Sequence, residues 1–459
     1  MRQSGAILLL SCYELGHQPL SLASPLAYLS RAGFAPSAID TSVQPLPDAA
    51  LRKAKLVAIS VPMHTALRLG VSIAKRVRAV NPQAHICFYG LYATLNAAYL
   101  LDGHGDSVIG GEYEQPLLEL ACALEKGTSL DLTGVGTRHK PSPPSRVRTS
   151  FATPDRSTLP GLESYARLQQ DHSLTLAGYV EASHGCLHTC LHCPLTPIYN
   201  GRLFVVPREV VLEDIRAQVS MGAGHITFGD PDFLNGPGHS LRILREMHEN
   251  FPHLTFDATI KIEHILERRN IFPELRELGC AFIVSAVESL SDTVLARLDK
   301  GHTRADVFEA LEIMRAAGIA LRPSLLPFTP WATMDDYIEL LRCFEEWGML
   351  EQVDPVQYSI RLLVPPGSAL ADDLAADGLL GRLDPAAYTY LWEHPDPRMD
   401  ELQREVAGIA ERAEHLGENP VKTFFWIKER AHAAAGLRTG ASHYLPRLGP
   451  PRLTESWFC

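Results

Sequence analysis

Three cysteines, Cys186, Cys190 and Cys193, lie within eight positions of the stretch EASHGCLHTCLHC. Thiols gathered this closely hold a metal ion or an iron–sulfur cluster, or form a disulfide. Structural zinc usually takes two separated ligand pairs, and no second pair follows here at zinc-ribbon spacing. Iron–sulfur clusters are held by closely spaced cysteines of one loop. We therefore favour a four-iron cluster with one iron free of protein ligands; zinc with a neighbouring histidine is the alternative.

Composition narrows the class of protein. The chain of 459 residues is long enough for two or three domains, and its net charge of −11 argues against a nucleic-acid partner. The apolar run at residues 6–10 is too short for a signal peptide or a membrane span. We therefore expect a cytoplasmic protein with no membrane partner, where a tight cysteine group binds metal rather than forming disulfides.

Residues 1–127 alternate short apolar strands with helical patterns. Such alternation, with strands apolar nearly throughout, predicts a parallel sheet covered on both faces. The fold class is thus α/β, beginning with a flavodoxin-like doubly wound domain whose ligand would lie across the carboxyl ends of the strands. The expected strands are residues 6–10, 37–42, 56–61, 85–90 and 107–112.

The rest of the chain divides into three parts. Residues 128–172 are rich in Pro, Ser, Thr and Arg without periodicity, which indicates a linker. Residues 173–370 resume the alternation and predict a partial (β/α)6 barrel, with the cysteines after its first strand, where barrels place functional residues. Residues 371–459 are expected to be helical to about 437 and irregular beyond. The expected barrel strands are residues 174–183, 225–230, 255–260, 281–289, 320–328 and 356–364.

The spacing Cys186-x-x-x-Cys190-x-x-Cys193 at the end of a first barrel strand resembles the radical S-adenosylmethionine (SAM) superfamily. The resemblance implies a [4Fe-4S] cluster whose open iron binds the amino and carboxylate groups of SAM. It also implies that an electron donor such as flavodoxin or ferredoxin reduces the cluster, which then splits SAM to a 5′-deoxyadenosyl radical. His192 stands where relatives carry an aromatic residue that touches adenine.

The resemblance continues in FGDPDFLN, which is similar to the Asp-Asp-x-Phe-x-x-Asn signature of cobalamin-linked members. It assigns Asp230 to the SAM ammonium and places Asp232 and Asn235 in the same loop. The resemblance also places Glu288, at the end of the fourth strand, where family members bind the ribose hydroxyls, and Lys261 where relatives often carry an Arg near the SAM carboxylate. Both are residue types that this ligand requires.

The chain departs from the family after the fifth strand. Many relatives show Gly-x-Pro-Gly-Glu there, whereas this chain has PFTPWATMDD. The loop is therefore specialised, and its Trp331 either lines a substrate pocket or packs on the following helix.

A flavodoxin-like domain ahead of such a barrel resembles the cobalamin-binding subclass, and SVIGGEYEQPLLELA (107–121) is similar to the end of that domain. The Asp-x-His-x-x-Gly signature that supplies a histidine to cobalt is absent, since CYELGH at 12–17 does not match it. We expect cobalamin without a protein ligand below cobalt, and a close approach of its tail at Ser60, Gly90 and Gly110. A domain kept only as a scaffold is the alternative.

The chain stops at RLTESWFC, on Cys459. This tail resembles a radical SAM branch ending in Cys-Cys-Ala-Glu-Pro or Cys-selenocysteine-Ala-Glu-Pro. Because UGA encodes selenocysteine and is also a stop codon, we expect the natural protein to run further as a candidate selenoprotein. Cys459 would then be a catalytic residue that binds a soft substrate or acts in redox chemistry.

The predicted function is a cobalamin-linked radical SAM enzyme acting on an unidentified small molecule or peptide, with methyl transfer favoured. Two alternatives stay open. One is a metal- or cobalamin-binding protein without turnover, and the other is radical SAM chemistry on a thiol or other soft-element substrate without cobalamin.

Overall fold

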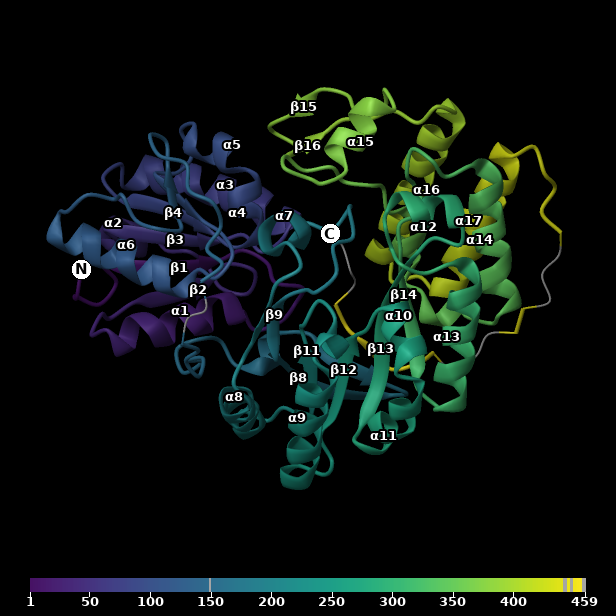
Figure 1. Cartoon of the computed structure of the whole chain (residues 1–459), viewed down its shortest axis with the longest axis horizontal. Helices are drawn as coiled ribbons and strands as arrows, with labels where there is room; N and C mark the ends of the chain where they lie inside the picture. Colours follow the sequence, from purple (N-terminus) through teal and green to yellow (C-terminus); the bar gives the residue numbers. More distant parts are fainter. Residues whose placement is uncertain (148–149, 441–443, 446–448, 456–459) are drawn as a thin grey trace.

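The computed structural model describes residues 1–147, 150–440, 444–445 and 449–455. Two sheets, each flanked by helices, lie beside one another, and the C-terminal helices pack on the second (Figure 1). No helix among the described residues is long and apolar enough to cross a membrane.

The first sheet confirms the doubly wound prediction. Its parallel strands run in the order β2-β1-β3-β4-β5. Alternate residues of β1 face opposite sides: Ile7 and Leu9 pack towards α1 (Leu20–Arg31) and α6 (Glu114–Lys126), while Leu8 and Leu10 pack towards α3 (His64–Val80). The other elements are β1 (Ile7–Ser11), β2 (Ser37–Asp40), α2 (Asp48–Lys53), β3 (Leu56–Ser60), β4 (His85–Tyr89), α4 (Leu91–Leu95), α5 (Ala97–Leu101) and β5 (Ser107–Ile109).

The segment 128–172, expected to be a linker, contributes a strand to each sheet. β6 (Val135–Thr137) pairs antiparallel with β5, and β7 (Arg167–Gln170) pairs antiparallel with β8 (Ser173–Val180). Arg156 is buried and binds Asp214 of α8 (Arg208–Ser220), with 2.6 Å between Nε and Oδ1. It also donates to the side-chain oxygen of Gln18 at 2.9 Å, so one buried guanidinium joins both domains.

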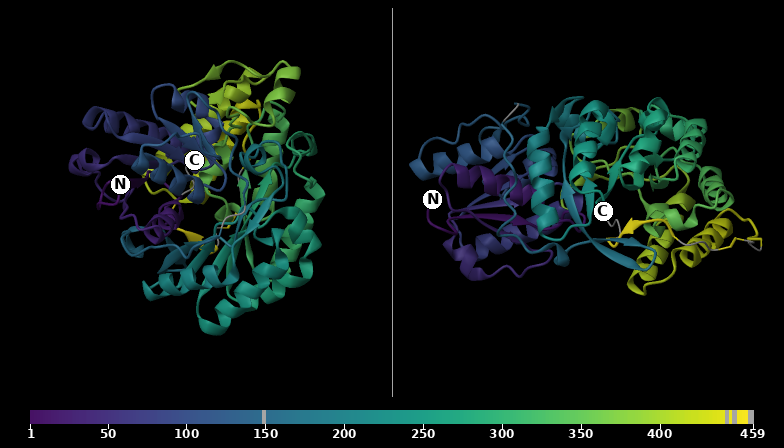
Figure 2. Two further views of the ribbon diagram at one scale, coloured as in Figure 1. Left: turned by 60° about the vertical axis from the view of Figure 1, so that its left-hand side comes forward. Right: turned by 90° about the horizontal axis from the view of Figure 1, so that it is seen from below.

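The second sheet is a curled half-barrel in the order β14-β13-β12-β11-β8-β7-β17, seen from two further sides in Figure 2. Strands β8 and β11 to β14 are parallel, and β7 and β17 (Arg452–Leu453) form an antiparallel edge. The remaining strands and longer helices are β11 (His225–Phe228), α9 (Pro237–Asn250), β12 (Thr255–Thr259), β13 (Cys280–Glu288), α13 (Arg304–Ala316), β14 (Ala320–Leu325) and α14 (Met334–Glu346).

The sixth expected barrel strand, residues 356–364, is not a strand, and this part of the (β/α)6 prediction was wrong. Pro355–Ser359 form a 3-10 helix, and Arg361 alone bridges to Phe328. Proline lacks an N–H and fixes φ, which favours the first turn of a helix over a strand. The side-chain oxygen of Gln357 accepts from Leu325 N at 2.8 Å, where a sixth strand would otherwise pair. Five parallel strands and one bridge remain.

The C-terminal region is helical with one small hairpin. α15 (Ala371–Ala376) precedes β15 (Leu383–Asp384) and β16 (Thr389–Tyr390), whose turn reaches the first domain, where His64 Nε2 lies 2.8 Å from Ala387 O. α16 (Pro397–His415) and α17 (Pro420–Ala434) pack on the barrel core.

Candidate active site at the cysteine loop

A short antiparallel hairpin closes the base of the cysteine loop. β9 (Ser183–Gly185) leads into the cysteines, and β10 (Leu203–Val205) leads out of them. At Gly185 φ is 77°, and a Cβ would lie 2.3 Å from Arg202 O, so only glycine fits. Asp230 anchors the hairpin, accepting from Ala182 N at 2.9 Å and Ser183 Oγ at 2.5 Å.

The three cysteines lie together in this loop without a disulfide. Cys186 and Cys190 are buried and Cys193 is half-buried. Asn235 Nδ2 donates to Cys186 Sγ at 3.4 Å, and the Thr196 hydroxyl donates to Cys190 O at 2.8 Å. Burial raises the pKa of the Cys193 thiol to about 11. Three free thiols of one loop are the donor set that a [4Fe-4S] cluster takes, so the residues present fit it.

Glu288 is held in a strained conformation beside the loop. Its φ is 61°, in the left-handed region, and its side chain is buried. One carboxylate oxygen, Oε1, lies 3.3 Å from His192 Nε2 and 3.2 Å from Lys300 Nζ. Burial alone would raise the pKa of Glu288, but Lys300 and His192 hold it at about 2. The carboxylate is therefore ionised and fixed at the strand end.

Lys300 was not predicted from the sequence. It follows α12 (Asp292–Arg297) and is buried, and nearby Glu288, Cys190 and Cys193 raise its pKa against the effect of burial. A lone lysine after a helix carries no signal in a sequence. In the fold it is a buried cation beside the cysteine sulfurs.

Two other predicted residues lie at α10 (Ile262–Glu267) and the loop after β11. Lys261 is buried and forms an ion pair with Glu263. Asp232 is fully buried, accepts from Leu234 N at 3.3 Å, and faces the imidazoles of His188 and His264 with its second oxygen. Burial alone would raise the pKa of Asp232, but the two imidazoles hold it at about 2.

A cavity of about 290 Å³ lies between the two domains and reaches the cysteine loop at Pro194 and Leu195. Its lining includes Ser60 and Gly90, whereas Gly110 is not part of it. A Cβ on Gly110 would lie 1.8 Å from Thr94 Oγ1, so this glycine serves packing on α4. The buried Ser60 hydroxyl has no hydrogen-bond partner among the described residues and is open to a ligand.

The cavity wall carries buried ionisable groups from both domains. Burial raises the pKa of Glu14 to about 7 and lowers that of His17 to about 4. Both residues line the cavity on the side of the first domain, and Tyr179 and Glu181 line it on the barrel side. At neutral pH His17 is therefore an uncharged imidazole, and its ring centre lies 4.7 Å from that of Tyr179, with the two rings tilted by 32°.

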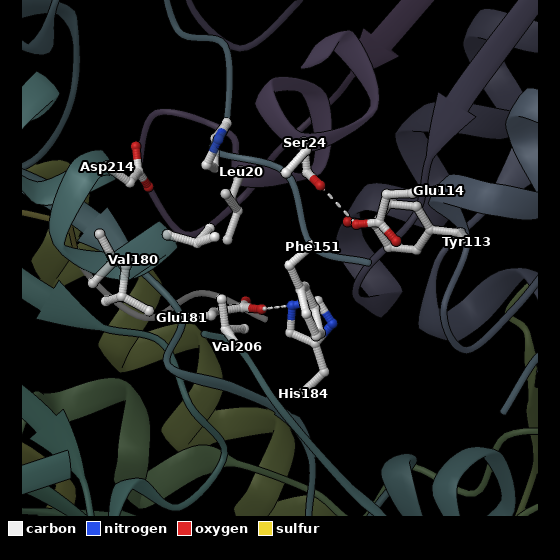
Figure 3. Close-up of a pocket in the computed structure, with 14 residues that line it drawn as sticks. Leu20, Ser24, Tyr113, Glu114, Phe151, Val180, Glu181, His184, Val206 and Asp214 are labelled. Carbon is white, nitrogen blue, oxygen red and sulfur yellow. Dashed lines mark hydrogen bonds and ion pairs between the residues drawn. The ribbon is translucent and has the colours of Figure 1, made fainter. Parts of the chain in front are cut away.

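His184 links the domains beside this cavity and was not predicted as a site residue. Its Nδ1 lies 3.0 Å from Glu112 Oε2 and its Nε2 lies 3.3 Å from Glu181 Oε2. Burial would lower the pKa of His184, but Glu112, Glu181 and Glu114 raise it to about 10. Figure 3 shows His184 against Phe151, at a small hollow where Ser24 donates to Glu114. The charged imidazole ties β9 to the first domain.

Two predicted residues lie elsewhere. Trp331 is half-buried before α14, with the Arg297 guanidinium carbon 5.7 Å from its ring centre, so it packs against α12. Cys459 lies outside the described residues.

Comparison with known proteins identifies the barrel. Residues 180–342 match the family model of the radical SAM superfamily. This span holds the three cysteines, Asp230, Lys261 and Glu288, and is a radical SAM domain. Residues 180–342 thus form a radical SAM domain, of a superfamily that uses a [4Fe-4S] cluster and SAM.

Curated relatives resemble part of the chain. The ribosomal protein uS12 methylthiotransferase RimO of Parabacteroides distasonis is 26% identical over 194 residues, 40% of this chain and 45% of that protein. The hopanoid C-3 methylase of Methylococcus capsulatus is 24% identical over 271 residues, 57% of this chain and 50% of that protein. The chain spans about half the length of these relatives.

Solved structures resemble nearly the whole chain. The cobalamin-dependent SAM radical enzyme OxsB, with aqua-cobalamin bound, superposes with a TM-score of 0.72 at 16% identity, covering 93% of this chain and 71% of that one. The radical SAM methyltransferase TsrM of Kitasatospora setae gives 0.68 at 15% identity, covering 95% of this chain and 100% of that one. At such identities the likeness shows the fold.

Proposed function

We propose that this protein is a cobalamin-dependent radical SAM enzyme that transfers a methyl group to a small-molecule or peptide substrate. The observation that carries the proposal is the cavity between the domains. It runs from the strand ends of the first sheet, at Ser60 and Gly90, to the cysteine loop at Pro194. Two proteins that share this fold over most of the chain are described with cobalamin bound.

When bound, the cluster would supply the electron that cleaves SAM to a 5′-deoxyadenosyl radical, and cobalamin would carry the methyl group. Cys186, Cys190 and Cys193 hold the cluster, and the Asn235 amide donates to the Cys186 sulfur. Glu288 is ionised, so it accepts hydrogen bonds from the ribose hydroxyls. His192 contacts Glu288, the proposed ribose ligand, and we assign its ring to the adjoining adenine.

Two of the assigned residues already have partners before SAM binds. Each oxygen of Asp230 accepts one hydrogen bond, from Ser183 or Ala182, and keeps a lone pair for the ammonium. Lys261 must exchange Glu263 for the SAM carboxylate. We retain both as proposed ligands of SAM, with anchoring of the loop as the role of Asp230 before binding.

The test is turnover by the reduced, reconstituted protein. Incubation with SAM is expected to release 5′-deoxyadenosine, and the Cys190→Ala variant, which loses a cluster ligand, is expected to release none. Cys122→Ala is the matched control, because Cys122 lies half-buried in α6 outside the loop. If the cluster-loaded wild type released no 5′-deoxyadenosine, the result would favour the alternative function, a metal- or cobalamin-binding protein without turnover.

Cobalamin binding is tested separately by titrating hydroxocobalamin and following its visible spectrum. Retention is expected, with a weaker complex for Ser60→Leu, which fills the cavity. Turnover without cobalamin retention would favour the alternative, radical SAM chemistry on a soft-element or thiol substrate with the first domain as a scaffold. The packing of Gly110 against Thr94 supports that second candidate.

A finer proposal is that the protein belongs to the branch with a Cys-Cys-Ala-Glu-Pro or Cys-selenocysteine-Ala-Glu-Pro tail. The described part of the tail supports a place near the cavity: Leu453 pairs with Leu168, and Tyr13 donates to Glu455 at 2.7 Å, next to the cavity residue Glu14. Sequencing the gene is the test. A UGA codon after Cys459, followed by Ala-Glu-Pro codons, is expected, and UAA or UAG would refute it.

A further inference from the structure

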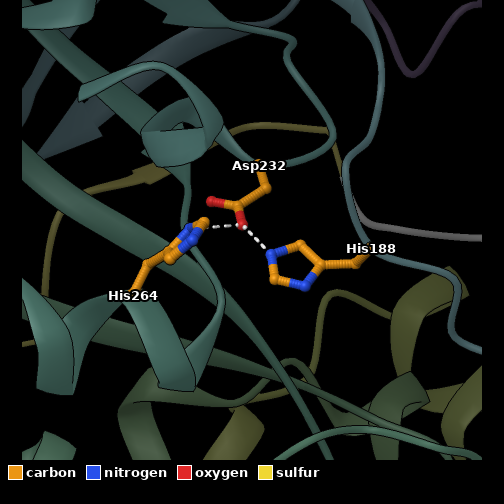
Figure 4. A group of neighbouring side chains, drawn as sticks. All are labelled: His188, Asp232 and His264. Atoms are coloured by element: carbon orange, nitrogen blue, oxygen red, sulfur yellow. Dashed lines mark ion pairs between the residues drawn. The ribbon is translucent and has the colours of Figure 1, made fainter. Parts of the chain in front are cut away.

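Besides the cysteines, a second set of metal-ligating side chains meets at the outer side of the loop. His188 comes from the loop itself, Asp232 from the segment after β11, and His264 from α10. One ligand atom from each lies within 4.8 Å of the other two. Figure 4 shows the Asp232 carboxylate between the two imidazoles, both of which turn a nitrogen towards it.

The contacts within this His–Asp–His cluster are close ion pairs whose geometry is not that of a hydrogen bond. Asp232 Oδ2 lies 3.3 Å from His188 Nε2 and 2.7 Å from His264 Nδ1. Among the described residues, none of these three buried atoms has a partner in hydrogen-bond geometry. An imidazole binds a metal along the axis of its ring-nitrogen lone pair. Ligand atoms around one ion therefore point at the ion and not at one another, so they lie close together without hydrogen-bond geometry. In a tetrahedral zinc site neighbouring ligand atoms are about 3.3 Å apart, close to the contact with His188.

The surroundings of the cluster resemble those of a bound metal. The second nitrogen of His188, Nδ1, lies 3.7 Å from Glu263 Oε2. A carboxylate beside the free nitrogen of a ligating histidine fixes the ring and raises its basicity. Asp232 is fully buried, and the cluster is enclosed enough to exclude bulk solvent from the carboxylate.

We propose that His188, Asp232 and His264 bind a zinc ion, with water at the fourth position. The donor set of two imidazoles and one carboxylate suits zinc, and three protein ligands leave one position open. The ion would join the cysteine loop, two residues from both Cys186 and Cys190, to the strand-end segment and to α10. This site is separate from the iron–sulfur ligands and does not depend on the proposed cobalamin or methyl-transfer function.

The test counts metals in the intact, cluster-loaded protein. After equilibration with zinc and removal of loose metal by gel filtration, about one zinc per chain is expected beside the iron. His264→Gln is expected to lose the zinc and keep the iron. Asp232→Asn should also lose it, but Asp232 caps Leu234 N, so His264→Gln is the decisive variant. His248→Gln, a helical histidine of α9 outside the cluster, is the control and should keep zinc.

X-ray absorption at the zinc edge distinguishes this site from zinc on the cysteines. Nitrogen and oxygen ligands at about 2.0–2.1 Å are expected, and sulfur at about 2.3 Å would overturn the proposal. Equal zinc content in wild type and His264→Gln, or no zinc in wild type, would also overturn it. A protein lacking Cys186, Cys190 and Cys193 should still bind zinc, which separates this result from any failure of the radical chemistry.

Discussion

At the scale of single residues, the site contains buried side chains that stay charged only because an opposite charge faces them. Glu288 and Lys300 are both buried and stay charged because each faces the other. Such a pair contributes little net stability compared with apolar residues, but removing one partner leaves an uncompensated buried charge. The pair therefore fixes the position of Glu288 at the cysteine loop.

Glu288→Gln is expected to destabilise the protein by about 3–5 kcal/mol, because it leaves Lys300 buried without its counter-charge. The measurement is the midpoint of urea unfolding, with SAM affinity by equilibrium dialysis beside it. The double variant Glu288→Gln/Lys300→Met should recover most of the stability and none of the affinity. An unchanged midpoint in the single variant would mean that Lys300 finds solvent or another partner.

His17 makes stability depend on pH. Its pKa in the folded protein is about 4, below the ordinary 6.5, because burial disfavours the charged imidazole. Between these values the unfolded chain holds the proton and the folded chain does not, so stability falls as pH falls from about 6.5 towards 4. At pH 5 this amounts to about 2 kcal/mol.

The His17→Gln variant removes that contribution. The drop in urea midpoint between pH 7 and pH 5 should be smaller than in wild type. His172→Gln, at an exposed position, is the control and should leave the drop unchanged. Identical pH profiles for His17→Gln and wild type would show that the imidazole is protonated in the fold.

At the scale of elements, the β9–β10 hairpin determines how firmly the cysteine loop is held. Asp230 accepts both hydrogen bonds that tie the start of this hairpin to the strand end of β11. Burial raises the pKa of Asp230 to about 7, against the two donors that lower it. Asp230, rather than a long ladder of backbone bonds, thus ties the start of the hairpin to β11.

Asp230→Ala is expected to leave the Ala182 N–H and the Ser183 hydroxyl without acceptors, at a cost of about 1–3 kcal/mol for each buried group. The loosened loop should lose iron faster when the cluster-loaded protein is challenged with a chelator. Ser183→Ala removes one of the two bonds and should give an intermediate rate. If Asp230→Ala lost iron at the wild-type rate, contacts other than those of Asp230 would hold the cysteine loop in place.

At the scale of the whole molecule, two charged side chains, Arg156 and His184, link the domains. Arg156 joins Asp214 to Gln18, and His184 joins Glu112 to Glu181. Both lie near the cavity between the domains, which therefore keeps its shape only while the domains stay in this arrangement.

Arg156→Met is expected to destabilise the protein by about 3–5 kcal/mol, since Asp214 is left buried and unpaired. A lower urea midpoint and faster proteolysis between residues 128 and 172 should follow. The double variant Arg156→Met/Asp214→Leu should regain stability while the link to Gln18 stays broken. Unchanged proteolysis in Arg156→Met would show that other contacts join the domains.

Elements whose signal is local could be predicted from the amino-acid sequence. The apolar strands of the first sheet, the five parallel barrel strands and the position of the cysteine loop were predictable, because strand periodicity and ligand spacing depend on residues close in the chain. The sixth strand was wrongly predicted, because Pro355–Ser359 form a 3-10 helix and the Gln357 side chain accepts from Leu325 N, which periodicity does not report.

Tertiary structure alone decided which side chains meet. Folding brings together residues from separate strands, helices and loops: Lys300 with Glu288, His184 with Glu112, and His188 with Asp232 and His264. Their spacing along the chain does not predict these contacts, because each contact depends on how the elements pack. The pKa values of Glu288 and His184 follow from burial together with the charges that face them, which are properties of the packed molecule and not of any segment.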